Sequence, residues 1–271
     1  MAPSTTITDD TVVGPHGPVP VRRYSPAAAS SPRLLWVHGG AFVSGGLDQR
    51  ESHEVALALS ALGTPVTTVD YRLASTRLSR LLRGGSGPDV RYPVPADDVL
   101  AVARHELRAG PLVVGGASAG AALAASAALA LADAGTPAAG ALLAYGILHA
   151  ALPAASPEAR RSIRRRGLRR ALHAPMTVRL MNRHYAGERM RERAAFPGGH
   201  PLGGFPDALV LDADRDVMRA SGTAFAEELA AAGVPVEHRV ALDASHAFLH
   251  RPRDSAFAPS IALMAGWLQE R

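Results

Sequence analysis

Residues 112–120 read Leu-Val-Val-Gly-Gly-Ala-Ser-Ala-Gly and indicate the fold more strongly than any other stretch of the chain. An apolar run precedes the glycines, and a long alanine-rich stretch suited to a helix follows them. This order of strand, tight turn and helix is the layout of a nucleophile elbow, with Ser118 at its tip. Gly116 and Gly120 suit such a turn because a Cβ would obstruct the close approach of strand and helix. The stretch therefore predicts an exposed Ser118 hydroxyl.

The segments around this turn alternate between strand and helix patterns. Strands are predicted at 33–37, 65–71, 112–115, 140–147, 208–213 and 234–242, and helices at 52–62, 95–107 and 258–268. Residues 8–13 and 18–24 flank a Gly-Pro-His-Gly turn and predict a hairpin. Alternating strands and helices predict an α/β fold, a mostly parallel sheet with helices on both faces. Chemically active side chains are then expected at the carboxyl ends of the strands.

The chain is predicted to form a single domain over residues 1–271. No linker or charge block divides it, and 47% hydrophobic with 20% charged residues is a globular composition. The long segment before the strand at 208–213 predicts two helices, one beginning at Ser156-Pro157 and one running from Pro175 to Gly187. This insertion, at about 149–205, is expected to cover the strand ends as a lid.

Composition limits the chemistry and the compartment. The absence of cysteine excludes disulfides, thiolate metal sites and cysteine nucleophiles. The N-terminal residues lack a basic region followed by an apolar core, which predicts a cytoplasmic protein. The uncharged stretch 111–132 is long enough to cross a bilayer. Pro111 and the Gly115-Gly116 pair make it a poor span, so no membrane span is predicted.

A serine hydroxyl becomes a strong nucleophile only when a positioned base removes its proton. His246 is the best candidate for this base, since it follows the last predicted strand and precedes the last predicted helix. His250 lies one helical turn later and is the weaker rival.

The base in turn needs a carboxylate, which in this layout follows a strand between the serine and the histidine. Asp212, Asp214 and Asp216 all lie near the end of the strand at 208–213, and Asp216 is favoured because it lies farthest beyond the strand. The alternating aspartates could also suggest a calcium loop. Val217 and Thr223 stand where such a loop needs glycine and glutamate, which argues against calcium.

Residues 38–41 read His-Gly-Gly-Ala and end the strand at 33–37. The backbone N–H groups of Gly39 and Gly40, with that of Ala119, are predicted to form an oxyanion hole. The alternative is a plain turn, which the nearby nucleophile motif makes the weaker interpretation.

Together these motifs resemble the hormone-sensitive-lipase-like branch of the α/β-hydrolases, chiefly bacterial carboxylesterases. The matching segments are 38–41, 70–74, 92–98, 116–120, 208–219 and 246–248, which spread the resemblance from about residue 10 to the C-terminus. The resemblance implies an α/β-hydrolase fold and a triad of Ser118, Asp216 and His246, without metal or cofactor. It also implies that Asp70, Arg72 and Asp97 brace the active-site loops.

The sequence departs from the family pattern in three places. Ala117 stands where the family usually has Asp, Glu or Thr. Few residues precede the strand at 33–37, so the N-terminal cap helices common in the family are not expected here, and a more open pocket is predicted. Residues 75–91 carry an extra segment whose role the sequence leaves open.

Twelve arginines between Arg160 and Arg193 form the one strong charge asymmetry. They could attract an acidic partner or nucleic acid. Stacking aromatics do not interleave with them, so a solvated lid surface is favoured and no nucleic-acid binding is predicted. Four histidines in or beside the lid lack metal-ligand spacing and are interpreted as surface or pocket-wall residues: His149, His173, His184 and His200.

These observations predict a serine carboxylesterase that hydrolyses small-molecule acyl esters through an acyl-enzyme at Ser118. Two alternatives stay open: an acyltransferase that uses an alcohol acceptor, and a hydrolase-shaped binding protein without turnover. The sequence does not identify the natural ester. A homodimer formed through the last strand and helix would suit the family.

Overall fold

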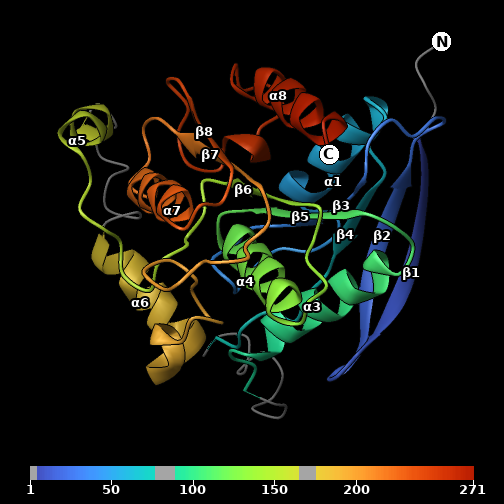
Figure 1. Cartoon of the computed structure of the whole chain (residues 1–271), viewed down its shortest axis with the longest axis horizontal. Coiled ribbons are helices and arrows are strands. Elements are labelled where there is room, and N and C mark those ends of the chain that lie inside the picture. The colour runs from blue at the N-terminus through green and yellow to red at the C-terminus, as the bar shows by residue number, and fades with distance from the viewer. Residues whose placement is uncertain (1–4, 77–88, 165–174) are drawn as a thin grey trace.

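The computed structural model describes residues 5–76, 89–164 and 175–271 (Figure 1). Most of the extra segment at 75–91 lies outside these ranges, as do His173 and four of the lid arginines. Within the described residues, an eight-stranded sheet forms the centre of the molecule, in the order β1-β2-β4-β3-β5-β6-β7-β8. The strands are β1 Thr6–Gly14, β2 Gly17–Ser25, β3 Arg33–Val37, β4 Val66–Val69, β5 Leu112–Ala117, β6 Gly140–Ala144, β7 Ala208–Ala213 and β8 Val236–Ala241.

The sheet is antiparallel at one edge and parallel elsewhere. β1 and β2 form the predicted hairpin, and β2 pairs antiparallel with β4. From β4 to β8 all pairs are parallel. Val37 pairs with Gly116, Ala117 with Ala144, and Ala144 with Leu211. The carboxyl ends of β3, β5, β6 and β7 are therefore level, and the loops that follow them meet at one edge of the sheet.

Helices cover both faces of the sheet (Figure 1). They are α1 Arg50–Ala61, α3 Val94–Leu107, α4 Ala119–Asp133, α5 Pro157–Arg164, α6 Pro175–Ala186, α7 Arg219–Ala231 and α8 Phe257–Gln269, with short 3₁₀ helices η2 Gly187–Arg191 and η3 Phe248–His250. Side chains of α3, α4 and α7 pack on one face, where Leu35 and Val37 point. Side chains of α1 and α8 pack on the other, where Leu34 and Trp36 point. The alternation within β3 thus builds two apolar layers, and the predicted mixed α/β architecture is confirmed.

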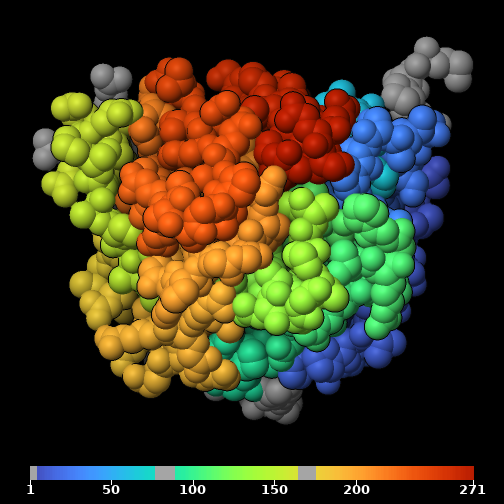
Figure 2. All heavy atoms as spheres, viewed as in Figure 1, coloured from blue at the N-terminus to red at the C-terminus, as the bar shows by residue number. Residues whose placement is uncertain are grey.

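The segment before β7 forms one side of the molecule. In the space-filling view the yellow-green atoms of α5 and the gold atoms of α6 and η2 lie beside orange α7 (Figure 2). The predicted helix starts agree with α5 and α6. The guanidinium of Arg219, at the start of α7, lies 2.8 Å from Glu158 of α5 and 2.9 Å from Asp214, the residue after β7. Arg219 thereby links α5 to the loop that follows β7.

Several predicted elements have slightly different bounds in the structure, and the end of β6 differs most. β6 ends at Ala144, three residues earlier than predicted, because Tyr145 adopts φ 37° and turns the chain out of the strand. The stretch 111–132 divides into β5 and the first part of α4. None of the helices in the described ranges combines the length and the apolar character that a membrane span requires.

Candidate active site

Ser118 occupies the turn between β5 and α4. Its backbone angles are φ 55° and ψ −119°, outside the regions that non-glycine residues prefer. The Ser118 N–H donates to the carbonyl of Ala144 at 2.9 Å, which fixes the turn against β6. Such strain persists only where surrounding contacts enforce it, and it is common at active sites.

Gly116 and Gly120 of the elbow leave no room for a Cβ. A Cβ at Gly120 would lie 2.1 Å from the carbonyl oxygen of Val37, and one at Gly116 would lie 2.6 Å from the backbone of Gly120. Backbone of β3 and α4 therefore fills the positions that side chains would take. The helix begins directly against β3, and this close packing positions the serine at the carboxyl edge of the sheet.

We expect Gly120→Ala to destabilise the protein by about 3 kcal/mol or more, because overpacking against fixed backbone exceeds the usual cost of an added methyl group. Gly266→Ala in α8 is the matched control, since nothing lies within 4 Å of a Cβ there. Because alanine is favoured over glycine in a helix interior, Gly266→Ala should raise the free energy of unfolding of the protein by about 0.5–1 kcal/mol. Chemical denaturation of both variants measures the difference, and equal stabilities would contradict the packing argument.

His246 and Asp216 complete a chain of hydrogen bonds with Ser118. The Oγ of Ser118 lies 3.0 Å from Nε2 of His246, and Nδ1 of His246 lies 2.5 Å from Oδ2 of Asp216. The other carboxylate oxygen of Asp216 accepts the N–H of Met218 at 3.2 Å. Asp216 is fully buried and the His246 side chain is 9% exposed. The structure thus brings together three residues that are far apart in the sequence.

The rival candidates from the sequence have other partners. Asp212 lies 2.8 Å from Nε2 of His238, and burial raises its pKa to about 6. Asp214 pairs with Arg219. His250 belongs to η3 and lines the cavity next to Ser118 without joining the hydrogen-bond chain described above. Among the described residues, no group of three or more histidines and carboxylates is arranged to hold a metal ion.

The loop after β3 differs from the prediction at Gly39. The Gly39 N–H donates to Oε2 of Glu51 at 2.7 Å, so this donor is already engaged by a side chain of the protein. Within the described residues, the N–H groups of Gly40, Ala41 and Ala119 take part in no backbone hydrogen bond. Gly40 and Ala41 also line the cavity that contains Ser118. The predicted donor Gly39 is therefore bound within the protein, whereas Ala41, which the sequence did not single out, borders the cavity.

Arg72 and Asp97, two of the residues expected to brace the loops, have separate partners. Arg72 donates from its guanidinium to Asp98 at 2.5 Å and from its backbone N–H to the same carboxylate at 2.9 Å. Asp98 is fully buried, whereas Asp97 pairs at 2.8 Å with His16 of the β1–β2 turn. The partner of Arg72 is thus Asp98, which follows Asp97 and was not among the residues expected to brace the loops.

Ser118 opens into a cavity of about 310 Å³. Its lining combines loop backbone, polar groups and two thioether side chains: Gly40, Ala41, Val43, Ser44, Gln49, Glu51, Ser118, Met181, Met218, His246, Ala247 and His250. Met181 comes from α6, so the segment before β7 supplies part of the wall. Glu51 is a buried acid that sequence reasoning did not single out.

Comparison with known proteins identifies the family. The sequence model of the alpha/beta hydrolase fold family matches residues 34–250, which is most of the chain. The protein belongs to this family, and the predicted resemblance to its hormone-sensitive-lipase-like carboxylesterase branch is confirmed.

Its relatives include named esterases. The chain is 31% identical to esterase LipI of Mycobacterium tuberculosis in an alignment of 269 residues. This alignment covers 91% of this chain and 76% of the relative. It is 32% identical to carboxylesterase NlhH of the same species, over 81% of this chain and 67% of the relative. The crystal structure of esterase LipW from Mycobacterium marinum aligns with a TM-score of 0.79 at 28% identity, over 98% of this chain and 82% of that one.

Proposed function

We propose that this protein is a serine carboxylesterase that hydrolyses small acyl esters. The observation that carries the proposal is the continuous hydrogen-bond chain from Ser118 through His246 to Asp216, with Ser118 bordering a cavity. The similarity to proteins named esterase and carboxylesterase supports the same class, a hydrolase acting on carboxylic esters.

In the first half of the reaction, Ser118 attacks the ester carbonyl carbon and His246 Nε2 takes its proton. Asp216 holds Nδ1–H, which fixes the tautomer and stabilises the imidazolium. The bond between the carbonyl carbon and the alcohol oxygen then breaks, and His246 returns the proton to the departing alcohol. Ser118 is left as an acyl ester.

In the second half, His246 removes a proton from water, the hydroxide attacks the acyl carbon, and the carboxylic acid leaves as Ser118 recovers its proton. An alcohol in place of water would make the protein an acyltransferase by the same steps. Product analysis in the presence of a primary alcohol distinguishes the two acceptors.

The negative oxygen of both tetrahedral intermediates needs N–H donors. We assign this role to Gly40 and Ala119, with Ala41 in place of Gly39, whose N–H is bound to Glu51. Ala41 has φ 54°, an uncommon conformation for a residue with a Cβ, as expected where loop backbone is shaped for function.

The size and lining of the cavity support a small acyl group. Met181 and Met218 offer flexible apolar surface, and a volume of about 310 Å³ is at the lower end of small-molecule sites.

Through Met181, the insertion at about 149–205 would act as a lid on this cavity. Several lid arginines are paired with acids, as in Arg189 with Glu192 and Arg193 with Asp133, which favours a solvated surface over nucleic-acid binding.

A fluorophosphonate probe tests the proposal against a binding protein of the same shape. The probe should label Ser118, and para-nitrophenyl acetate and butyrate should be turned over faster than long-chain esters. A folded protein that neither reacts with the probe nor hydrolyses any ester of this series would support the non-catalytic alternative.

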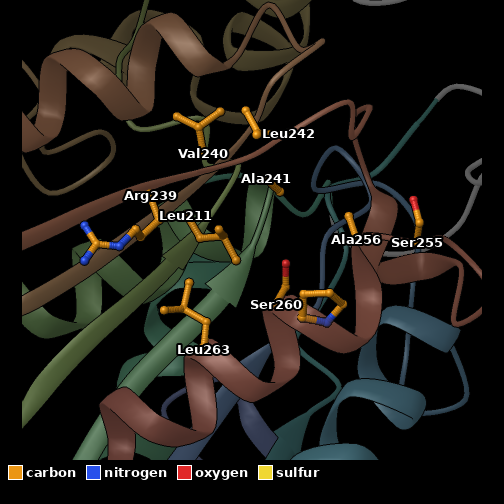
Figure 3. Close-up of a pocket in the computed structure, with 10 residues that line it drawn as sticks. Leu211, Arg239, Val240, Ala241, Leu242, Ser255, Ala256, Ser260 and Leu263 are labelled. Carbon is orange, nitrogen blue, oxygen red and sulfur yellow. The ribbon is translucent and has the colours of Figure 1, made fainter.

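We also propose a homodimer through β8 and α8. β8 is the last strand of the sheet, and Leu242 just beyond it is 79% exposed. A cavity of about 370 Å³ lies between β8 and α8, where Ser260 and Leu263 project from the helix toward Leu211 and Arg239 (Figure 3).

The sequence of β8 is compatible with pairing to a second copy. Antiparallel pairing of two β8 strands about His238 would place Glu237 of one copy opposite Arg239 of the other, a favourable pair of charges. Light scattering should give twice the monomer mass, and Leu242→Arg should reduce it. A monomer at all concentrations would contradict this assembly.

A further inference from the structure

Glu51 is a buried acid next to the nucleophile. It lies in the first turn of α1, is 2% exposed and lines the same cavity as Ser118. Both of its carboxylate oxygens accept hydrogen bonds from neutral donors, the Gly39 N–H at 2.7 Å and the Tyr145 O–H at 2.7 Å. Burying an acid is costly unless its oxygens are satisfied, and here the two partners belong to two different parts of the active site.

The first partner belongs to the loop that carries the proposed oxyanion donors. A Cβ at Gly39 would lie 2.5 Å from Oε2 of Glu51 and 3.1 Å from Cβ of Ser118, so carboxylate, glycine and nucleophile are in close contact. The next three residues, Gly40, Ala41 and Phe42, all have positive φ, of 120°, 54° and 65°. Such a run is unfavourable for Ala and Phe and needs support from outside the loop. The Glu51 carboxylate provides this support at the preceding peptide.

The second partner packs against the proposed base. Tyr145 follows β6, is fully buried, and places its ring edge-on to His246 with centroids 5.2 Å apart. Burial, followed by the charge of Glu51, raises the pKa of Tyr145 well above its usual value. The phenol therefore stays protonated and donates to Glu51. The same ring contacts Phe248 of η3, so it forms part of the wall behind the histidine.

We propose that Glu51 is a positioning residue whose single carboxylate ties the oxyanion loop to the tyrosine wall of His246. It holds the Gly40 and Ala41 N–H groups and the imidazole in a fixed relation to Ser118. This inference rests on the proposed esterase function, since it concerns how the same site is organised.

The role predicts an effect on turnover more than on substrate binding. Hydrogen bonds to the oxyanion strengthen only as the transition state forms. Loss of one direct donor costs about 10²- to 10³-fold in kcat. Glu51 acts through Gly39, so we expect Glu51→Ala to lower kcat by about 10- to 100-fold while KM stays within about twofold.

Three further variants separate the parts of this arrangement. Tyr145→Phe removes only the second hydrogen bond and should lower kcat less than Glu51→Ala, by about threefold to tenfold. Glu51→Gln keeps the shape and one acceptor for Gly39, so it should recover part of the loss. Glu54→Gln is the matched control on the same helix, since Glu54 lies at a separate surface pocket with Arg50 and Arg251. The kcat and KM of this control should equal those of wild type.

The deciding readout is affinity for a trifluoromethyl ketone with a short alkyl chain, which reacts with the serine to form a tetrahedral oxyanion. In the Glu51 and Tyr145 variants its affinity should fall in proportion to kcat/KM, as expected for lost transition-state stabilisation. A purely structural role would lower the unfolding temperature without this proportionality. If Glu51→Ala does not fold, Glu51→Gln and Tyr145→Phe give the same comparison.

The inference is overturned if the folded variants turn over ester and bind the ketone within about twofold of wild type, or if their whole loss is in KM. Failure of the proposed function gives a different result, because wild type itself would then show no ester turnover that depends on Ser118. If wild type is active and the Glu51 and Tyr145 variants match it in ester turnover and ketone affinity, only the positioning role is contradicted.

Discussion

Ser118→Ala is expected to lower kcat/KM for para-nitrophenyl acetate by about 10⁵- to 10⁶-fold, the loss seen when a serine nucleophile is removed from a working triad. Alanine leaves the oxyanion donors and the cavity intact but offers no oxygen to form the acyl-enzyme. The small residual rate should come from these donors acting on attack by water. Initial rates at saturating and limiting ester measure the effect.

Ser126→Ala is the control for this variant. Ser126 lies in the same helix that begins after Ser118, is 6% exposed, and its hydroxyl has no hydrogen-bond partner within the described residues. Its removal should leave kcat/KM within about twofold of wild type. A Ser118→Ala protein that keeps activity comparable to this control would rule out Ser118 as the nucleophile.

Asp216→Asn is expected to lower kcat by about 10⁴-fold with little change in KM. Oδ2 of Asp216 lies 2.5 Å from Nδ1 of His246, so the carboxylate keeps the proton on Nδ1 and leaves Nε2 free to accept from Ser118. An amide can donate to Nδ1 and favour the opposite tautomer, which places the proton on Nε2. The base is then lost although the shape of the site is retained.

Asp214→Asn tests whether this loss is specific. Asp214 lies two residues earlier on the same loop and pairs with Arg219 at 2.9 Å. Its substitution should weaken the connection to α5 and change kcat by no more than about threefold. Equal losses in the two variants would indicate that the loop as a whole was disturbed, and would contradict a specific role for Asp216.

Features defined by local sequence were predictable. The elbow at Ser118 follows from a strand, a glycine-rich turn and an alanine-rich helix, each of which depends on neighbours in the chain. The alternation of strands and helices was enough to predict a mostly parallel sheet, and the structure confirms it. His246 and Asp216 could be selected because a parallel sheet brings the loops after its strands to one edge.

Features set by peptide orientation or by distant contacts were not predictable. The direction of the Gly39 N–H depends on the rotation of one peptide, and its partner, Glu51, lies twelve residues further along the chain. Glu51 itself stands in the polar run Arg-Glu-Ser-His-Glu, which looks like an exposed helix start. Only packing of α1 against the sheet shows that this acid points inward. The apolar pattern around Tyr145 predicts a strand there, whereas in the structure its positive φ ends β6.

The central claim is an ester bond between the substrate acyl group and Ser118. Wild-type protein should be mixed with para-nitrophenyl butyrate, quenched in acid within milliseconds, digested, and analysed by tandem mass spectrometry. The account predicts a butyryl group on Ser118 that appears with the first release of nitrophenol and disappears as ester is exhausted. Turnover that continues without any acyl group on Ser118, or with the acyl group on another residue, would contradict it.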